Sequence, residues 1–104
     1  MSDTQARIKQ MVEGSKVFLF MKGTPDFPQC GFSMRASSVL NHLGVAYNSF
    51  DVLTDPNVRQ GIKDYANWPT IPQLYVNGEF VGGCDIMVEM FQNGELEQLV
   101  KPAE

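Results

Sequence analysis

The spacing of apolar residues along the chain predicts helices that alternate with short strands. The run Val17–Met21 is apolar at every position, which is typical of a central strand that is buried on both faces. Before it, Ile8, Met11 and Val12 recur at helical spacing and predict a helix whose cap lies among residues 2–4. The chain therefore begins with a helix that leads into a buried strand.

A second helix is predicted after a loop at residues 23–29. Apolar side chains recur at helical spacing over residues 32–43, so this helix begins at Cys30 and ends at Gly44. Phe32 belongs to this pattern, and we expect its side chain to lie partly in the core. The loop thus delivers Cys30 to the first turn of a helix that follows a strand.

The second half of the chain predicts a strand, a helix, a hairpin and two further helices. Residues 47–52 have the pattern of a strand, and Asp55 followed by Pro56 is typical of a helix start. Asn77-Gly78 is the strongest short signal for a hairpin turn. The remaining elements are expected as strands at 73–76 and 79–81 and as helices that begin near residue 84 and at residue 95.

The order of these elements predicts the fold. A right-handed crossover makes the first two strands parallel, and the hairpin adds two antiparallel strands. We therefore expect an α/β protein with a thioredoxin-like layout, in which a four-stranded mixed sheet is flanked by about five helices. A chain of 104 residues has the usual size of one domain, so we expect a single domain over residues 1–104.

Composition excludes several classes of function. The formal net charge of −4 argues against nucleic acid as a partner, because a phosphate-binding face needs a basic surface. No apolar run is long enough to cross a membrane, and the first residues lack the pattern of an export signal. The two cysteines do not make a disulfide scaffold. We expect a reducing location, the cytoplasm, and no membrane partner.

Cys30 is the strongest candidate for chemistry. It opens the tetrapeptide Cys30-Gly31-Phe32-Ser33, in which Ser33 occupies the position of the second cysteine of a dithiol redox protein. At the start of a helix, unpaired N–H groups and the helix dipole favour a thiolate over a thiol. Any reaction that needs a second sulfur must therefore find it elsewhere than in this turn.

Three motifs together resemble one family. They are the Cys30–Ser33 tetrapeptide with Lys22 eight residues upstream, the segment Trp68-Pro-Thr-Ile-Pro-Gln73, and the segment Gly82-Gly-Cys-Asp85. In this combination the chain is similar to the monothiol glutaredoxins of the CGFS type, in register from about residue 15 to residue 100. The resemblance implies the glutaredoxin fold, glutathione binding, and a [2Fe–2S] cluster that bridges two chains and serves iron–sulfur assembly, storage or transfer.

The resemblance also implies a glutathione site. Lys22 and Arg59 are expected to hold the glycyl carboxylate, although both side chains can equally be solvated surface charges, and Lys63 is expected to be solvated. Pro72 is a candidate for a cis-proline, which leaves the backbone of Ile71 free to pair with a peptide, or else forms a rigid turn. The expected glutathione-binding residues are Lys22, Arg59, Thr70, Ile71, Pro72, Gly83, Cys84 and Asp85.

Cys84 and Asp85 open the fourth predicted helix, and each has two interpretations. The free N–H groups of this turn suit the γ-glutamyl carboxylate, and the Asp85 side chain can accept from the γ-glutamyl amine or simply cap the helix. Cys84 is either part of this site or a small buried residue. A disulfide between Cys30 and Cys84 under oxidation is a further hypothesis.

The ligand count for a cluster predicts a dimer. A [2Fe–2S] cluster takes four ligands, normally thiolates. Two Cys30 thiolates and two glutathione thiolates supply four, so we expect a homodimer when the cluster is bound and a monomer when it is not. Iron–sulfur apoproteins are the expected recipients, and the resemblance implies a BolA-like protein as a partner.

An enzymatic function is the alternative. A single thiol suffices to reduce a mixed disulfide with glutathione, provided that a second glutathione molecule completes the reaction. Cys30 would then be the nucleophile of a glutathione-dependent thiol–disulfide oxidoreductase. The sequence leaves both functions open.

Overall fold

Four strands form one mixed sheet in the order β2-β1-β3-β4 in the computed structural model, which describes residues 3–101. β1 runs parallel to β2 and antiparallel to β3, and β3 pairs with β4 in the hairpin at Asn77. The predicted thioredoxin-like layout is therefore confirmed. The strands are β1 (Val17–Met21), β2 (Asn48–Asp51), β3 (Gln73–Val76) and β4 (Glu79–Gly82).

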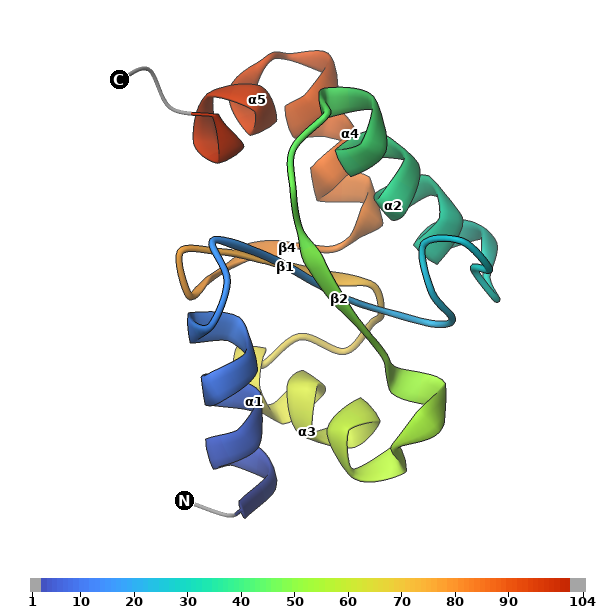
Figure 1. The fold of residues 1–104 in the computed structure, drawn as a ribbon, viewed down its shortest axis with the longest axis vertical. Helices are drawn as coiled ribbons and strands as arrows, with labels where there is room; N and C mark the ends of the chain where they lie inside the picture. Colours follow the sequence, from blue (N-terminus) through green and yellow to red (C-terminus); the bar gives the residue numbers. More distant parts are fainter. Residues whose placement is uncertain (1–2, 102–104) are drawn as a thin grey trace.

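Five helices cover the two faces of this sheet. In Figure 1, α1 and α3 lie below it, whereas α2, α4 and α5 lie above it. Their bounds agree with the sequence pattern. Of the three candidate caps of the first helix, Asp3 and Thr4 lie within α1, and Ser2 lies outside the described residues. The helices are α1 (Asp3–Glu13), α2 (Gly31–Leu43), α3 (Pro56–Ala66), α4 (Cys84–Gln92) and α5 (Glu95–Val100). None of the helices in the described chain is both long and apolar enough to cross a membrane.

β1 divides the core into two clusters. Successive side chains of a strand point to opposite faces. Val17, Leu19 and Met21 accordingly pack with residues of α2, α4 and α5, whereas Phe18 and Phe20 pack with residues of α1 and α3. All five side chains are buried, so the prediction of a central strand covered on both faces is confirmed.

Two strands, β2 and β4, have bounds that differ from the sequence pattern, and β2 begins one residue later than predicted, at Asn48. β2 ends at Asp51, because Val52–Thr54 form a single 3₁₀ turn instead of extending the strand. The Asp51 carboxylate caps this turn by accepting a hydrogen bond from the Leu53 N–H at 2.9 Å. β4 extends one residue further than predicted, to Gly82. The sequence pattern does not predict the 3₁₀ turn, because three residues are too few to show a helical repeat.

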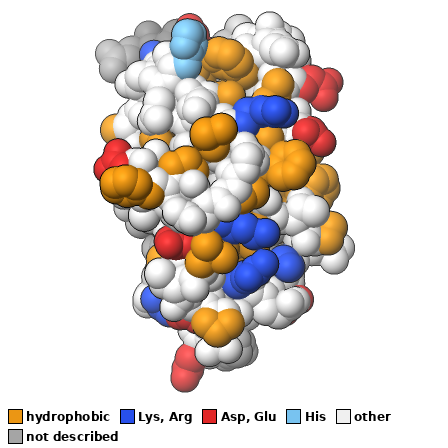
Figure 2. Space-filling view, turned by 90° about the vertical axis from the view of Figure 1, so that its right-hand side faces the viewer, with side chains coloured by type: hydrophobic (Ala, Val, Ile, Leu, Met, Phe, Trp, Pro, Cys, Tyr) orange, Lys and Arg blue, Asp and Glu red, His pale blue; other side chains and the backbone are white. Residues whose placement is uncertain are grey.

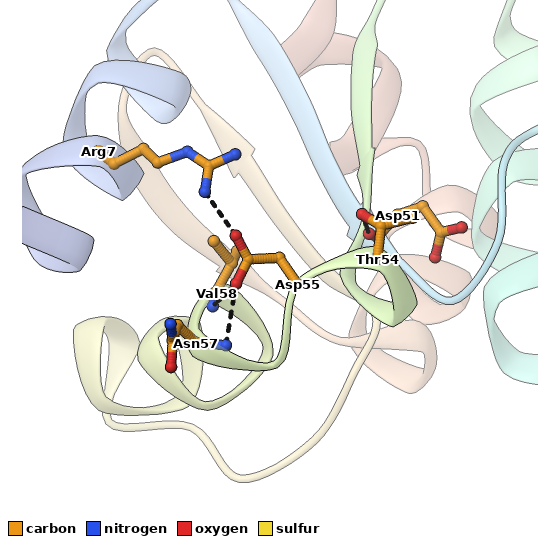
Figure 3. A network of polar contacts seen from close by, with 6 residues as sticks. All are labelled: Arg7, Asp51, Thr54, Asp55, Asn57 and Val58. Atoms are coloured by element: carbon orange, nitrogen blue, oxygen red, sulfur yellow. Dashed lines mark hydrogen bonds and ion pairs between the residues drawn. The ribbon is translucent and has the colours of Figure 1, made fainter.

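The start of α3 is fixed by Asp55, as its place before Pro56 predicts. The Asp55 carboxylate accepts hydrogen bonds from the N–H groups of Asn57 and Val58 at 3.0 and 3.2 Å. The same carboxylate pairs with the Arg7 guanidinium at 2.6 Å (Figure 3). This pair joins α1 to the first turn of α3, the turn that carries Arg59.

Candidate functional site

Cys30 lies at the start of α2 with its thiol partly exposed. It is the N-cap residue in an extended conformation, and its carbonyl accepts from the Met34 N–H at 2.9 Å. Its side chain does not cap the helix. The sulfur is therefore placed at the positive end of a helix dipole and is accessible to a reaction partner.

The surroundings of Cys30 lower the pKa of its thiol. Burial raises this pKa, but the N–H groups of Ser33 and Phe32, the Ser33 hydroxyl and the charge of Lys22 together outweigh burial. Ser33 itself is fully buried. The structure thus has a preformed environment for the Cys30 thiolate, built by the first turn of its own helix and by the end of β1.

The loop between β1 and α2 holds Lys22 in place. The Lys22 carbonyl accepts from the Gln29 N–H at 2.9 Å, and the next N–H, of Gly23, donates to the Asp51 carboxylate at 2.9 Å. Gly23 has a φ of +90°, and a Cβ there would lie 2.4 Å from the Phe27 carbonyl oxygen. Because glycine alone fits this close approach, the loop folds back and leaves the Lys22 side chain beside the start of α2.

A cavity of about 540 Å³ lies beside this loop. It is formed by the end of β1, the first half of α3, the segment before β3 and the first turn of α4. All eight residues that the sequence suggests for glutathione line it, so the fold gathers them from four separate segments. These residues are Lys22, Arg59, Thr70, Ile71, Pro72, Gly83, Cys84 and Asp85.

Five further residues line the same cavity. Lys63 was expected to be solvated, but it lies one turn after Arg59 on α3 and reaches the cavity from the same face of the helix. Phe32 was expected to lie partly in the core, but 58% of its surface is exposed, because α2 begins at the surface. Helical spacing alone could have indicated Lys63. The complete set of additional lining residues is Phe32, Lys63, Trp68, Pro69 and Ile86.

The backbone before β3 turns at a cis peptide bond. The bond lies between Ile71 and Pro72, which confirms the cis-proline prediction. Trp68, the only tryptophan of the chain, contributes to the same wall. Its buried indole N–H has no hydrogen-bond partner among the described residues.

The first turn of α4 closes the cavity on its other side. Gly83 is the N-cap residue and provides no side-chain cap, so Asp85 lies inside the first turn and is exposed. The structure therefore does not show Asp85 as the cap of α4, which was one of the two interpretations of this residue. The free N–H groups of this turn are a favourable environment for an anion.

Cys84 differs from Cys30 in its surroundings. Burial raises the pKa of the Cys84 thiol, and the charges of Asp85 and Cys30 add to this rise against the lowering effect of Arg35. The charge of Cys30 thus acts on Cys84, but the pKa of the Cys30 thiol is lowered whereas that of the Cys84 thiol is raised. Both are free thiols in the structure.

The face that carries the start of α2 is both apolar and basic. Figure 2 shows Lys and Arg side chains among apolar ones on this face. Three of the large apolar side chains exposed on the protein, Phe27, Phe32 and Met34, lie within four residues of Cys30 in the sequence. No group of three or more His, Cys, Asp or Glu side chains able to hold a metal ion occurs within residues 3–101.

Comparison with known proteins places these features in context. The family model described as glutaredoxin matches residues 17–81. The chain is 58% identical over 101 residues to an uncharacterized monothiol glutaredoxin ycf64-like of Synechocystis sp., which covers 97% of this chain and 94% of that protein. It is 54% identical over 95 residues to monothiol glutaredoxin-S11 of Oryza sativa. This match covers 91% of this chain but only 19% of that longer protein.

A solved structure gives the same result. The chain superimposes on the solution structure of a monomeric truncated mutant of Trypanosoma brucei 1-C-Grx1 with a TM-score of 0.85. The two share 40% identity, and the match covers 97% of this chain and 92% of that one. The comparison of sequences and the comparison of structures therefore point to the same family.

Proposed function

The chain belongs to the glutaredoxin family, among its monothiol members, and from this premise we propose that it binds glutathione and carries a [2Fe–2S] cluster between two copies of itself. One observation supports the proposal above all others. A single thiol of lowered pKa, Cys30, lies beside a cavity whose charges match those of glutathione. The cluster would be cargo that the dimer delivers to iron–sulfur apoproteins.

Glutathione has a carboxylate at its glycyl end and a carboxylate and an amine at its γ-glutamyl end. In the proposed arrangement Lys22 and Arg59 hold the glycyl carboxylate. The Ile71 backbone pairs with the middle of the peptide as an added strand would. The first turn of α4 takes the γ-glutamyl carboxylate, and Asp85 accepts from its amine. The thiol of glutathione then lies near Cys30.

In this proposal each chain supplies one of the four ligands of the cluster. Thiolates are the usual ligands of [2Fe–2S] clusters, and Cys30 meets this need because it is accessible and readily ionised. Cys84 suits it less, because burial disfavours its thiolate. Two Cys30 thiolates and two glutathione thiolates complete the set of four. Because two of these ligands are diffusible, the cluster should be easily transferred.

Anaerobic reconstitution tests this function. Purified protein is incubated with iron and sulfide, with and without glutathione, and the mass of the product is measured together with its iron and sulfide content. We expect a coloured dimer with two iron atoms only when glutathione is present. Cys30→Ser should abolish binding and Cys84→Ser should weaken it in part. A loaded monomer, or loading without glutathione, would contradict the proposal.

The lowered pKa of Cys30 also favours a second candidate, a glutathione-dependent oxidoreductase. The Cys30 thiolate would attack the glutathionyl sulfur of a mixed disulfide, and the substrate thiolate would leave and take up a proton. A glutathione thiolate would then attack the Cys30–glutathione disulfide, releasing oxidised glutathione and regenerating the Cys30 thiolate. Fast reduction of a glutathionylated peptide by a colourless monomer would favour this candidate over the cluster carrier.

Two predictions from the sequence accompany the proposal. A BolA-like protein is the partner that the resemblance implies, and the cytoplasm is the expected location. Both free thiols require a reducing compartment to stay reduced. Copurification of the tagged chain from its natural host would test the partner, and cell fractionation would test the location.

A further inference from the structure

Gln73 is a polar side chain that is completely buried at the start of β3. Its amide nitrogen donates to the carbonyl of Trp68 at 3.2 Å and to the carbonyl of Thr70 at 3.3 Å. Its amide oxygen accepts from the Tyr75 hydroxyl at 3.0 Å. One interior side chain is therefore bonded to two carbonyls of the segment that lines the candidate glutathione cavity.

The orientation of this amide follows from the chemistry of its partners. A carbonyl oxygen can only accept, so the NH₂ group must face Trp68 and Thr70. The oxygen of the amide then faces Tyr75, which must donate. Burial, aided by the neighbouring Tyr65, raises the pKa of Tyr75 well above its ordinary value, so its hydroxyl keeps the proton that this hydrogen bond needs.

The bond to Thr70 determines where the next N–H points. The peptide between Thr70 and Ile71 is trans, because the cis bond of this segment lies after Ile71. In a trans peptide the C=O and N–H groups point in opposite directions. Gln73 draws the Thr70 carbonyl toward the interior, so the Ile71 N–H is directed away from it. No hydrogen bond within the described chain uses that N–H.

We propose that Gln73 is a positioning residue that directs the Ile71 N–H toward bound glutathione, with Tyr75 fixing the orientation of its amide. This inference rests on the proposed glutathione site and extends it to two residues that do not line the cavity. Gln73 acts through the backbone of Thr70 and Ile71. Its removal should therefore affect one hydrogen bond to the ligand and leave the charged contacts of Lys22 and Arg59 in place.

Gln73→Met tests the inference, because methionine has a similar length but cannot donate. S-methylglutathione is the probe, since it keeps the peptide but cannot react with Cys30, and calorimetry gives its dissociation constant. We expect the constant to rise about three- to tenfold, as for the loss of one backbone hydrogen bond. In ¹⁵N-resolved NMR spectra, the Ile71 amide signal should shift on binding in the unsubstituted protein and much less in Gln73→Met.

Two further variants separate positioning from general stability. Val100→Ala removes buried volume in α5, in the core cluster on the face of the sheet opposite to the cluster of Ile71 and Tyr75, and should lower stability without changing the dissociation constant. Gln73→Glu, studied at pH 5.5, retains one donor while its buried carboxyl is protonated. Its dissociation constant should lie between those of the unsubstituted protein and Gln73→Met.

The outcomes are distinct from those that test the proposed function. If the unsubstituted protein does not bind S-methylglutathione, the glutathione site itself is wrong. If it binds, and Gln73→Met binds within twofold with the same Ile71 shift, the role of Gln73 is wrong. Weakening by Val100→Ala equal to that by Gln73→Met would also overturn the role of Gln73, because loss of stability would then explain the effect. Binding by Gln73→Glu no better than that by Gln73→Met would overturn it as well.

Discussion

The hydroxyl of Ser33 accepts a hydrogen bond from the backbone N–H of Lys22 at 2.9 Å. This bond joins the end of β1 to the first turn of α2, across the loop that precedes Cys30. Because the Ser33 oxygen is engaged as an acceptor, its own proton is available to the Cys30 sulfur, and it contributes to the lowered pKa of that thiol. Ser33 therefore links the Cys30 thiol to the backbone of Lys22, one of the cations that line the cavity.

Ser33→Ala should make Cys30 less reactive at neutral pH. The substitution removes the side-chain hydrogen bond that lowers the Cys30 pKa, so this pKa rises and the thiolate fraction falls. It also leaves the Lys22 N–H without its partner, which should lower the free energy of unfolding by about 1–2 kcal/mol. The rate of alkylation by iodoacetamide, measured against pH, should move to higher pH.

Ser37→Ala is the matched control for this change. Ser37 is also a buried serine of α2, and its hydroxyl donates to the Met34 carbonyl at 3.1 Å, one turn further along. Its alkylation profile should coincide with that of the unsubstituted protein. Coincident profiles for Ser33→Ala and the unsubstituted protein would show that the Ser33 hydroxyl does not stabilise the thiolate.

Gly23→Ala should destabilise the protein more than the same substitution at Gly94. Both glycines have positive φ, +90° and +85°, so alanine at either position costs about 1–2 kcal/mol in backbone conformation. A Cβ at Gly94 meets no atom within 4 Å, whereas at Gly23 it meets the Phe27 carbonyl oxygen at 2.4 Å. Overpacking should add about 1–3 kcal/mol at Gly23 alone. Urea unfolding gives the free energy of unfolding of both variants. Equal losses of this free energy in Gly23→Ala and Gly94→Ala would contradict the role of this close approach.

Much of the fold could be predicted from local sequence patterns. The buried strand Val17–Met21, the cap at Asp55 and the hairpin at Asn77-Gly78 depend on neighbouring residues, and all are observed. The burial of Gln73 could not be predicted in this way. A polar residue in a strand is normally expected at the surface, and its partners, two carbonyls and a tyrosine hydroxyl, meet it only when the segment before β3 folds back.

The candidate site could likewise be predicted only in part, because some of its features depend on contacts between distant segments. The motifs and the resemblance that they carry indicated eight of the residues that line the cavity, although these eight lie in four separate segments. Lys63 was expected in solvent, although its spacing of four residues from Arg59 places the two cations on one face of α3 and could have indicated its place at the cavity. The exposure of Phe32 depends on where α2 meets the surface, which helical spacing does not reveal.

Asp55 should make stability depend on pH in the acid range. The Arg7 guanidinium, and then the N–H groups of Val58 and Asn57, hold the pKa of this carboxyl below its ordinary value of 3.8. Since the folded-state pKa is the lower one, the stabilisation is complete above the ordinary value and is lost as the pH falls through the folded-state value. Urea midpoints of the unsubstituted protein and of Asp55→Ala should therefore converge between neutral pH and pH 2.

Arg7→Gln tests the cause of this shift. It removes the hydrogen bond that contributes most to the lowered pKa of Asp55, together with the smaller effect of the Arg7 charge, but leaves the two N–H groups of α3 in place. The convergence with Asp55→Ala should then begin near the same pH, which the unfolded-state pKa determines, but should be complete at a higher pH, because the folded-state pKa is less lowered. A profile unchanged by Arg7→Gln would mean that the helix N–H groups alone stabilise the carboxylate.

Lys22→Gln and Arg59→Gln should weaken glutathione binding through the glycyl carboxylate. Each removes a charge-assisted hydrogen bond at the edge of the cavity, and we expect the dissociation constant to rise about tenfold, with a smaller difference at high salt. Lys9→Gln, an exposed lysine of α1, is the control and should leave the dissociation constant unchanged. Calorimetry with S-methylglutathione provides the measurement.

A second ligand identifies which end of glutathione these cations contact. The C-terminal amide of S-methylglutathione lacks the glycyl charge but keeps the γ-glutamyl end, so it should bind the unsubstituted protein about tenfold more weakly than the acid. In Lys22→Gln and in Arg59→Gln the advantage of the acid over the amide should shrink without vanishing, because the other cation still contacts the glycyl carboxylate. If the acid keeps its full advantage in both Lys22→Gln and Arg59→Gln, the glycyl carboxylate lies elsewhere, and Lys63, the third cation of the cavity, becomes the next to test.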